Sequence, residues 1–260
     1  FFDRGVVGLG YMERIDRNRL DEVEARVRAA GQPEFKIERR GDTPMAYVVT
    51  NIEPFARNAL ALGQDIAAGV NRRAAAELAM RTGEPTISRK IALIEGATTA
   101  PGCLLFLPVY SPGVALTDPA ARERALRGWV YAALRVDLLL RGAADATEEQ
   151  VEFEAFEDRP ATAATLLFDA DNRLDFDDAR WGSDVSDEAA AFETTLPLPV
   201  FGREWVLRLR TLPEFDARGN RWLAWFLLGG GTMATLLGVG FTWSLVGARA
   251  RALRLADRMT

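Results

Sequence analysis

One uncharged stretch near the C-terminus constrains this chain more than any other feature. From Trp222 to Ala248 the sequence WLAWFLLGGGTMATLLGVGFTWSLVGA contains no Asp, Glu, Lys or Arg. A bilayer hydrocarbon core of about 30 Å needs about 20 apolar residues in a helix, so this run is long enough to cross a membrane. Trp225 and Trp243 lie near its ends, where aromatic rings favour the headgroup region. The sequence therefore predicts a transmembrane helix over residues 221–248 rather than the buried helix of a soluble domain.

The charges around this stretch predict its orientation. Arginine follows it at Arg249, Arg251, Arg254 and Arg258. Because loops rich in Lys and Arg stay in the cytoplasm, residues 249–260 are expected inside the cell, at the start of a signalling helix. Residues 1–220 are then expected outside the inner (cell) membrane, in the periplasm or the extracellular space.

Composition excludes several classes of function. The net charge is −5, and carboxylates are concentrated between Asp145 and Glu193, which argues against nucleic-acid binding. The sequence contains no histidine, which removes histidine-based catalytic triads and most zinc sites. With Cys103 as the single cysteine, an internal disulfide is impossible. We expect no cofactor and no metal.

The pattern before the membrane stretch predicts an α+β fold in two parts. Residues 1–141 alternate helices with strands of a mostly antiparallel sheet. Helices are expected from a cap at Asp16 to Ala30, from Pro54 to Leu62, from a cap at Asn71 to Thr82, and from Val136 to Arg141. Strands are expected at Val6–Ile15, Phe35–Arg39, Met45–Asn51, Thr86–Ile94, Gly102–Tyr110 and Arg127–Arg135.

A polar, acidic segment at residues 142–149 marks a boundary, and the chain then becomes mostly β. The second part, residues 142–220, is expected to contain the strands Val151–Glu157, Ala163–Asp169, Phe192–Leu198 and Glu204–Thr211. In the last of these, apolar residues alternate with arginines, which is typical of a half-buried strand.

Asp65 is the carboxylate whose position best fits a ligand contact. It follows Gly63 at a helix end, inside an apolar region of the chain. A carboxylate beside a strand edge can accept N–H donors from a flat ligand, while backbone groups pair with the ligand's other edge. The same residue can instead cap the helix that follows. Spacing leaves both roles open.

Small residues recur at a fixed spacing inside the membrane stretch. Gly230, Ala234 and Gly238 fall four apart, on one face of a helix. Small residues at this spacing allow two membrane helices to approach closely, so we expect a homodimer contact here, against the alternative of ordinary glycine content.

An ordered set of short motifs resembles the CHASE domain. The motifs are Gly8-Leu-Gly-Tyr11, Pro54-Phe-Ala-Arg-Asn58, Gly63-Gln-Asp65, Ala79-Met-Arg-Thr-Gly83, Pro108-Val-Tyr110, Gly128-Trp-Val130 and Val136-Asp-Leu-Leu139. CHASE domains are the extracytoplasmic sensors of cytokinin-receptor-like histidine kinases and of bacterial diguanylate and adenylate cyclases. The resemblance covers about residues 5–141, and the family's second part would continue to about residue 212.

The resemblance implies a fold and a ligand site. The fold is a long N-terminal helix followed by two PAS-like subdomains. That helix and a first membrane span before it are expected ahead of this chain. The ligand is expected in the membrane-distal subdomain. In plant members an aspartate and a strand backbone bind an adenine ring, and by position these match Asp65 and Ile87. Strand positions add Met45, Tyr47, Phe106 and Tyr110 to the expected pocket. Bacterial members need not bind cytokinins. The resemblance therefore implies a small-molecule ligand, with purine-like compounds among the candidates.

We therefore expect the ligand-sensing and transmembrane region of a receptor, a sensor histidine kinase or a diguanylate cyclase, with its output domain after Thr260. Two alternatives remain open at this point. One is a membrane-anchored extracytoplasmic enzyme, although the chain shows no catalytic motif. The other is an ectodomain that binds a partner rather than a small ligand.

Overall fold

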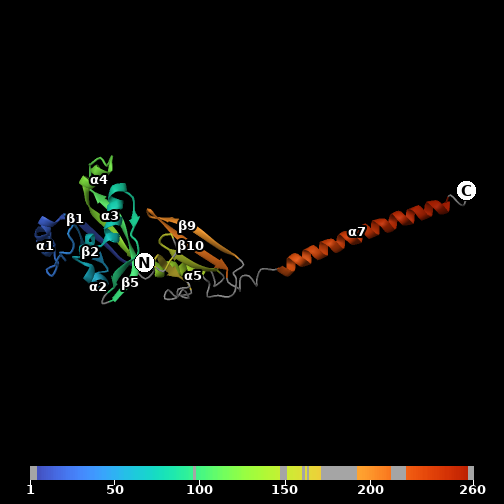
Figure 1. The fold of residues 1–260 in the computed structure, drawn as a ribbon, viewed down its shortest axis with the longest axis horizontal. Helices are drawn as coiled ribbons and strands as arrows, with labels where there is room; N and C mark the ends of the chain where they lie inside the picture. Colours follow the sequence, from blue (N-terminus) through green and yellow to red (C-terminus); the bar gives the residue numbers. More distant parts are fainter. Residues whose placement is uncertain are drawn as a thin grey trace. The chain divides into compact units, whose positions relative to one another are not determined.

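The computed structural model describes residues 5–95, 98–146, 151–159, 162, 164–170, 192–211 and 221–256 (Figure 1). The chain forms two compact units, Phe1–Leu212 and Pro213–Thr260. The first unit contains two antiparallel sheets, and the second contains one long helix. The predicted α+β class with two antiparallel sheets and a following apolar helix is therefore confirmed.

The first sheet has the strand order β2-β1-β6-β5-β3, and β4 pairs with β5 beside this path. All of its strand pairs are antiparallel. The strands span β1 (Val6–Asp16), β2 (Met45–Glu53), β3 (Thr86–Ile87), β4 (Ile91–Glu95), β5 (Thr98–Tyr110) and β6 (Leu126–Leu134).

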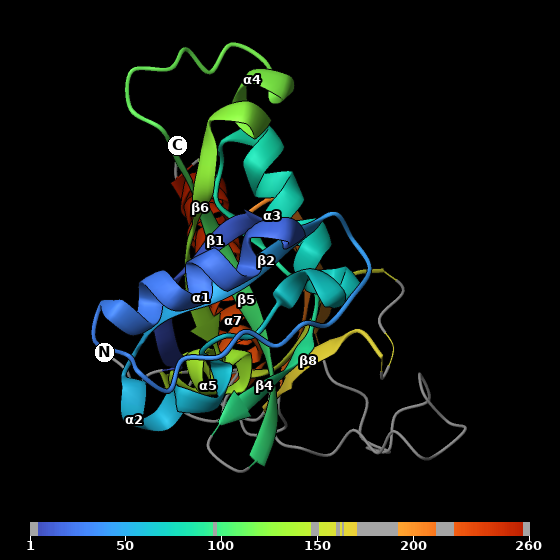
Figure 2. The same ribbon diagram turned by 90° about the vertical axis from the view of Figure 1, so that its left-hand side faces the viewer.

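The two faces of the first sheet bury different helices. One face packs against α3 (Val70–Thr82), together with the short helices α2 (Phe55–Asn58), η2 (Ala59–Ala61) and η3 (Ile66–Ala68). The other face packs against α1 (Leu20–Ala29), which follows η1 (Arg17–Arg19) and is seen crossing β1 and β2 in Figure 2. We call the first of these the α3 face. Its core is built around Met12, Phe106 and Trp129, which have no exposed surface.

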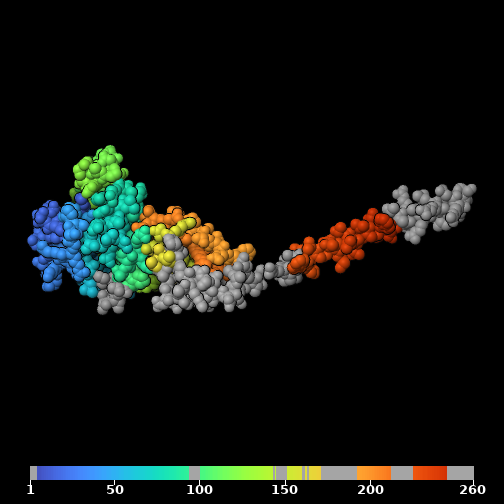
Figure 3. All heavy atoms as spheres, in the orientation of Figure 1, coloured from blue at the N-terminus to red at the C-terminus, as the bar shows by residue number. Residues whose placement is uncertain are grey.

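The second sheet has the strand order β8-β7-β10-β9, with β7 (Val151–Phe156), β8 (Leu166–Asp169), β9 (Glu193–Val200) and β10 (Arg203–Thr211). The helix α5 (Val136–Ala146) leads toward it from the first sheet. One apolar cluster contains Ile87 and Cys103 of the first sheet together with Phe153 and Trp205 of the second. In Figure 3 the orange atoms of β9 and β10 lie against the teal atoms of the first sheet.

The second unit contains α7 (Arg221–Ala256). Residues Trp225–Ser244 within it are long and apolar enough to cross a membrane, with a mean hydropathy of 1.3, and none of that stretch is buried inside the protein. The large apolar side chains of this stretch are exposed, including Trp225 and Trp243. A helix that is apolar all round needs an apolar environment, and the described residues of this chain do not supply one.

The structure corrects several predicted elements. Phe35–Arg39 is not a strand, because its backbone bonds go elsewhere: the Ile37 N–H donates to the Glu24 carboxylate and the Glu38 N–H to the Gly63 carbonyl. Phe35 and Ile37 are buried beneath α1 all the same. The alternation of apolar residues in this segment thus correctly indicated which side chains are buried, but it did not indicate pairing in a sheet.

Two further boundaries differ from the expectation. The predicted strand Thr86–Ile94 is two strands, because the Ser88 hydroxyl accepts the Leu104 N–H and donates to the Arg89 carbonyl, which turns the chain. The helix expected after a cap at Asn71 begins at Val70 with Gly69 as its N-cap. The loop after Tyr110 also contains a short helix, α4 (Pro119–Ala125), whose first turn is capped by Asp118.

Candidate functional site

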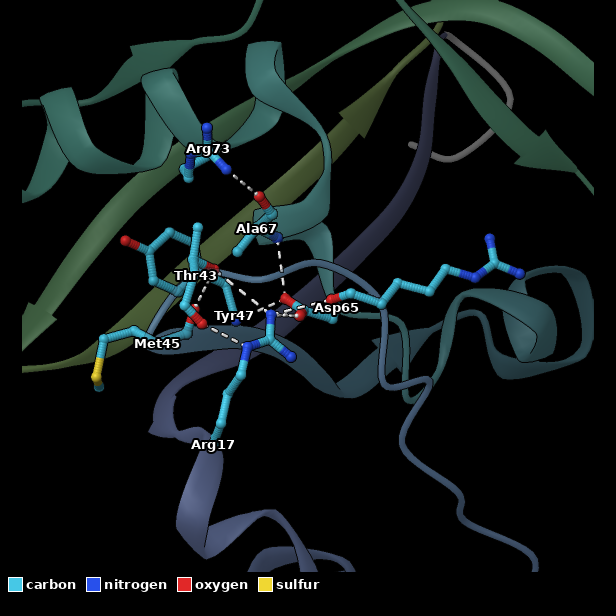
Figure 4. Close-up of polar contacts among 8 residues, drawn as sticks. Arg17, Thr43, Met45, Tyr47, Asp65, Ala67 and Arg73 are labelled. Atoms are coloured by element: carbon cyan, nitrogen blue, oxygen red, sulfur yellow. Dashed lines mark hydrogen bonds and ion pairs between the residues drawn. The ribbon is translucent and has the colours of Figure 1, made fainter.

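Asp65 lies at the start of η3, against the edge strand β2. Its side chain has no exposed surface. Oδ1 accepts the backbone N–H groups of Tyr47 and Ala67, each at 3.0 Å, and Oδ2 accepts a guanidinium N–H of Arg17 at 2.5 Å (Figure 4). The bond from Ala67 is the N-terminal cap of η3, so the capping role that spacing left open is present in the structure.

Arg17 explains why a carboxylate can be buried here. Its guanidinium also donates to the carbonyl oxygens of Thr43 and Arg40 and to the Thr43 hydroxyl. One side chain thus joins the end of β1, the loop before β2 and the start of η3. An isolated buried carboxylate is costly, whereas one with three donors, one of them charged, is compensated.

Asp65 helps to position Tyr47. It accepts the Tyr47 backbone N–H, and the Tyr47 side chain lies in the core of the α3 face. Its ring packs against Trp129 with ring centroids 4.6 Å apart. Burial, followed by the charge of Glu77, raises the pKa of Tyr47 to about 12, although the Arg14 guanidinium beside it acts in the opposite direction. Its hydroxyl therefore stays protonated at neutral pH and is available as a hydrogen-bond donor.

The remaining expected residues on the α3 face differ in exposure. Met45 is half-buried beside Tyr47, whereas Phe106 is fully buried in the core. Tyr110 is half-buried, and its hydroxyl donates to the Met80 carbonyl of α3 at 2.7 Å. The structure thus brings Met45, Tyr47, Phe106 and Tyr110 together on one face of the sheet.

Ile87 lies apart from this group. Its side chain belongs to the cluster shared with the second sheet rather than to the α3-face core. Its backbone N–H donates to the Phe201 carbonyl at 3.0 Å, and its carbonyl accepts the Arg203 Nε–H at 3.0 Å. The backbone groups expected to bind ligand therefore pair with the β9–β10 turn at Phe201 and with the start of β10 at Arg203.

We call residues Ile87–Lys90 and their partners on the second sheet the junction. Beyond Ile87, the Lys90 N–H donates to the buried Glu157 carboxylate, and the Lys90 ammonium donates to the Leu166 carbonyl at 2.8 Å. Arg89 and Asp158 form a half-exposed ion pair at 2.7 Å. The junction joins the edge of the first sheet to β7, β8 and the β9–β10 turn.

Three arginines near Asp65 were missed by the sequence interpretation. Arg17 binds Asp65, Arg73 of α3 donates to the Ala67 carbonyl at 2.8 Å, and Arg14 of β1 pairs with Glu123 of α4 at 2.7 Å. The sequence position of Arg14 could have indicated its role, because Arg14 lies on the same face of β1 as the buried Met12. A charged residue at an inward strand position is unusual and indicates a partner.

Two buried polar atoms on the α3 face have no protein partner in the part of the chain that the structure describes. They are Nε of Arg14 and the hydroxyl of Tyr131. Tyr131 lies deeper, with its ring over Gly10, where a Cβ would lie 2.6 Å from the ring. Buried polar groups are nearly always hydrogen-bonded, so each of these atoms calls for a water or ligand acceptor.

An open groove of about 1120 Å³ lies on the first unit, and Asp65 does not line it. One wall is the segment 31–40, and the other is formed by the end of β2 with α2 and η2. Phe55 and Leu60 are exposed on its second wall, and a buried amide oxygen of Gln32 lies on its first. None of the six expected ligand residues lines it.

Comparison with known proteins identifies the family. The model of the CHASE domain matches residues 2–168, which include the whole first sheet, β7 and all of β8 but its last residue. Among curated proteins no match is found. A solved structure titled "Methyl-accepting Chemotaxis protein X" is similar, with 11% identity and a TM-score of 0.40, over 80% of this chain and 75% of that one. The CHASE match spans more than half of the sequence, and the chain therefore belongs to the CHASE-domain family.

Proposed function

We propose that this chain is the ligand-sensing and transmembrane region of a receptor that passes a signal to a histidine kinase or a diguanylate cyclase. CHASE-domain membership supports an extracellular sensory role for the first unit. The observation that carries the whole proposal is the order of the chain: a CHASE domain, then α7 with an unburied stretch of membrane-spanning length. A sensor joined directly to a membrane helix has a covalent route for its signal.

We further propose the topology and the place of the ligand. Residues 1–220 lie in the periplasm or outside the cell, α7 crosses the inner membrane, and residues 249–260 begin a cytoplasmic signalling helix. A small molecule, with purine-like compounds among the candidates, binds in the membrane-distal, PAS-like part formed by residues 1–141. The contacts expected there are Met45, Tyr47, Phe106 and Tyr110, with Asp65 fixing the backbone of Tyr47.

The junction supplies the route between the two PAS-like parts. Ligand binding changes the first sheet, and Ile87 moves the β9–β10 turn through its two backbone bonds. β10 ends at Thr211, shortly before α7. A ligand shifts such a two-state system only by its difference in affinity for the two states, so the pocket has to differ in shape between them.

Cross-linking in membranes tests this function. Cys103 is fully buried and its pKa is raised to about 12, chiefly by burial, so a Cys103→Ala background removes little reactivity. We expect Ala234→Cys in α7 to form disulfides between copies at a rate that changes when a stabilising metabolite is added. Val239→Cys, on another face of the helix, is the control. An unchanged rate with a compound that raises the melting temperature would contradict signalling through α7.

We also propose that α7 pairs with α7 of a second copy through Gly230, Ala234 and Gly238. In the single chain a Cβ added at Gly230 or Gly238 has no atom within 4 Å. A larger side chain at either position therefore makes no steric clash within one protomer. The double change Gly230→Leu and Gly238→Leu is expected to weaken self-association in a membrane dimerisation assay. At about 100° per residue, Gly229 and Gly240 lie on another face, and Gly229→Leu with Gly240→Leu should leave the signal intact. Equal loss in both pairs would refute the assigned face.

A further inference from the structure

The polar groups around Tyr47 define what kind of ligand the α3 face can hold. We call Arg14, Met45, Tyr47, Arg73 and Glu77 the Arg14 rim. Arg14 pairs with Tyr47 in the β1–β2 register, so the two side chains are neighbours on one face. Arg73 and Glu77 lie one turn apart on α3, and Glu77 is close enough to Tyr47 to raise its pKa. All but Tyr47 are half-buried, so the group lies at the edge of the core rather than inside it.

The acidic side chains of this region are each paired with an arginine. Both oxygens of Asp65 accept protein N–H groups, and its side chain has no exposed surface. Glu77 is paired with Arg81 at 3.3 Å, and Glu123 is paired with Arg14 at 2.7 Å. A ligand that offers N–H donors would therefore compete with arginines for these carboxylates.

Donors, in contrast, remain available. Nε of Arg14 is buried without an acceptor in the described part of the protein. The same guanidinium donates to Glu123 through Nη2 and lies within hydrogen-bonding reach of the Tyr47 hydroxyl. Arg73 donates to the Ala67 carbonyl and has no acidic partner among the described residues. Figure 4 shows Arg73 and the Tyr47 ring beside the Asp65 network, with Arg17 on its other side. Arg17, Arg81 and Arg14 pair with the three acids of this region, Asp65, Glu77 and Glu123, so none of these acids compensates Arg73.

We propose that the Arg14 rim binds the carboxylate of a small organic acid, with Nε of Arg14 donating to it and Arg73 balancing its charge. One carboxylate satisfies both observations: it supplies an acceptor to a buried guanidinium N–H and a negative charge beside Arg73, which has no acidic partner among the described residues. Tyr47 and Met45 contact the apolar body of the ligand. This inference rests on the proposed sensor function and narrows the ligand class to acids.

Thermal shift of the full chain in detergent tests the proposal. The probes are aliphatic and aromatic monocarboxylates, each beside its own primary amide, which has nearly the same shape without the charge, and adenine as a purine. We expect one or more carboxylates to raise the melting temperature while the matched amides do not. Arg14→Gln should weaken that binding roughly 10- to 100-fold, because a hydrogen bond to a charged group is lost.

The variants separate binding from folding. Arg14→Lys keeps the charge but has no Nε–H, so it should lose most of the affinity. Arg73→Gln is the second test if Arg14 variants fail to fold by circular dichroism. Arg124→Gln removes the same charge from an exposed position on α4 and should bind as the parent does. A shift with adenine or amides that survives Arg14→Gln would overturn the acid assignment and leave the sensor function standing. No shift with any carboxylate would overturn it as well.

Discussion

Asp65→Ala is expected to lower the free energy of unfolding by about 3–5 kcal/mol, the usual cost of removing one partner of a buried ion pair. The substitution leaves Arg17 without its carboxylate, and it leaves the N–H groups of Tyr47 and Ala67 without their acceptor. The measurement is urea denaturation of the chain, followed by circular dichroism. Since the effect arises from desolvated groups, added salt should change it little.

Two comparisons make the Asp65 result interpretable. Asp16→Ala removes the cap of η1, an exposed position, and should cost about 1 kcal/mol. Asp65→Asn keeps an acceptor for the two backbone N–H groups but loses the charge opposite Arg17, so it should fall between the two. A cost no larger than that of Asp16→Ala would show that the network is weak and would favour direct ligand binding by Asp65.

The second large effect is expected at the junction, where signalling rather than stability should fail. Arg203→Met removes the bond to the Ile87 carbonyl, and Glu157→Gln weakens the bond from the Lys90 N–H. Burial lowers the pKa of Arg203, the charge of Arg89 adds to this, and the charge of Glu157 acts in the opposite direction, so this guanidinium is held in a partly desolvated place. We expect the double variant to bind ligand normally by thermal shift and to lose all ligand-dependent change in α7 cross-linking.

A surface pair provides the matched control for the junction. Arg159 and Glu204 lie 3.4 Å apart on the second sheet, and both side chains are largely exposed. Exposed ion pairs contribute little, so Arg159→Met should leave binding and cross-linking as they are. If the junction variant kept its ligand-dependent cross-linking, the route from first sheet to α7 would have to bypass Ile87, and the proposed coupling would be wrong.

The local parts of this protein followed from its sequence. The apolar length of α7, the strands β1 and β6, and the helix α3 were predicted because each depends on periodicity or composition within a short window. The motifs that resemble a CHASE domain are likewise short, and the family match confirms them. Errors arose where an apolar pattern is compatible with two local structures, as at Phe35–Arg39, where Phe35 and Ile37 are buried although the segment does not join a sheet.

What only the tertiary structure decided is where distant polar groups meet. The carboxylate of Asp65 is used by Arg17, which lies 48 positions away, and Ile87 is bonded to Arg203, 116 positions away. No local pattern encodes such pairs, because they depend on which strands become neighbours and which side of each strand faces inward. The sequence therefore determined that a sensor-like domain precedes a membrane helix. The fold determined that the Asp65 carboxylate is used to hold the structure together, and that the polar atoms left without a partner among the described residues on the α3 face are Nε of Arg14 and the Tyr131 hydroxyl.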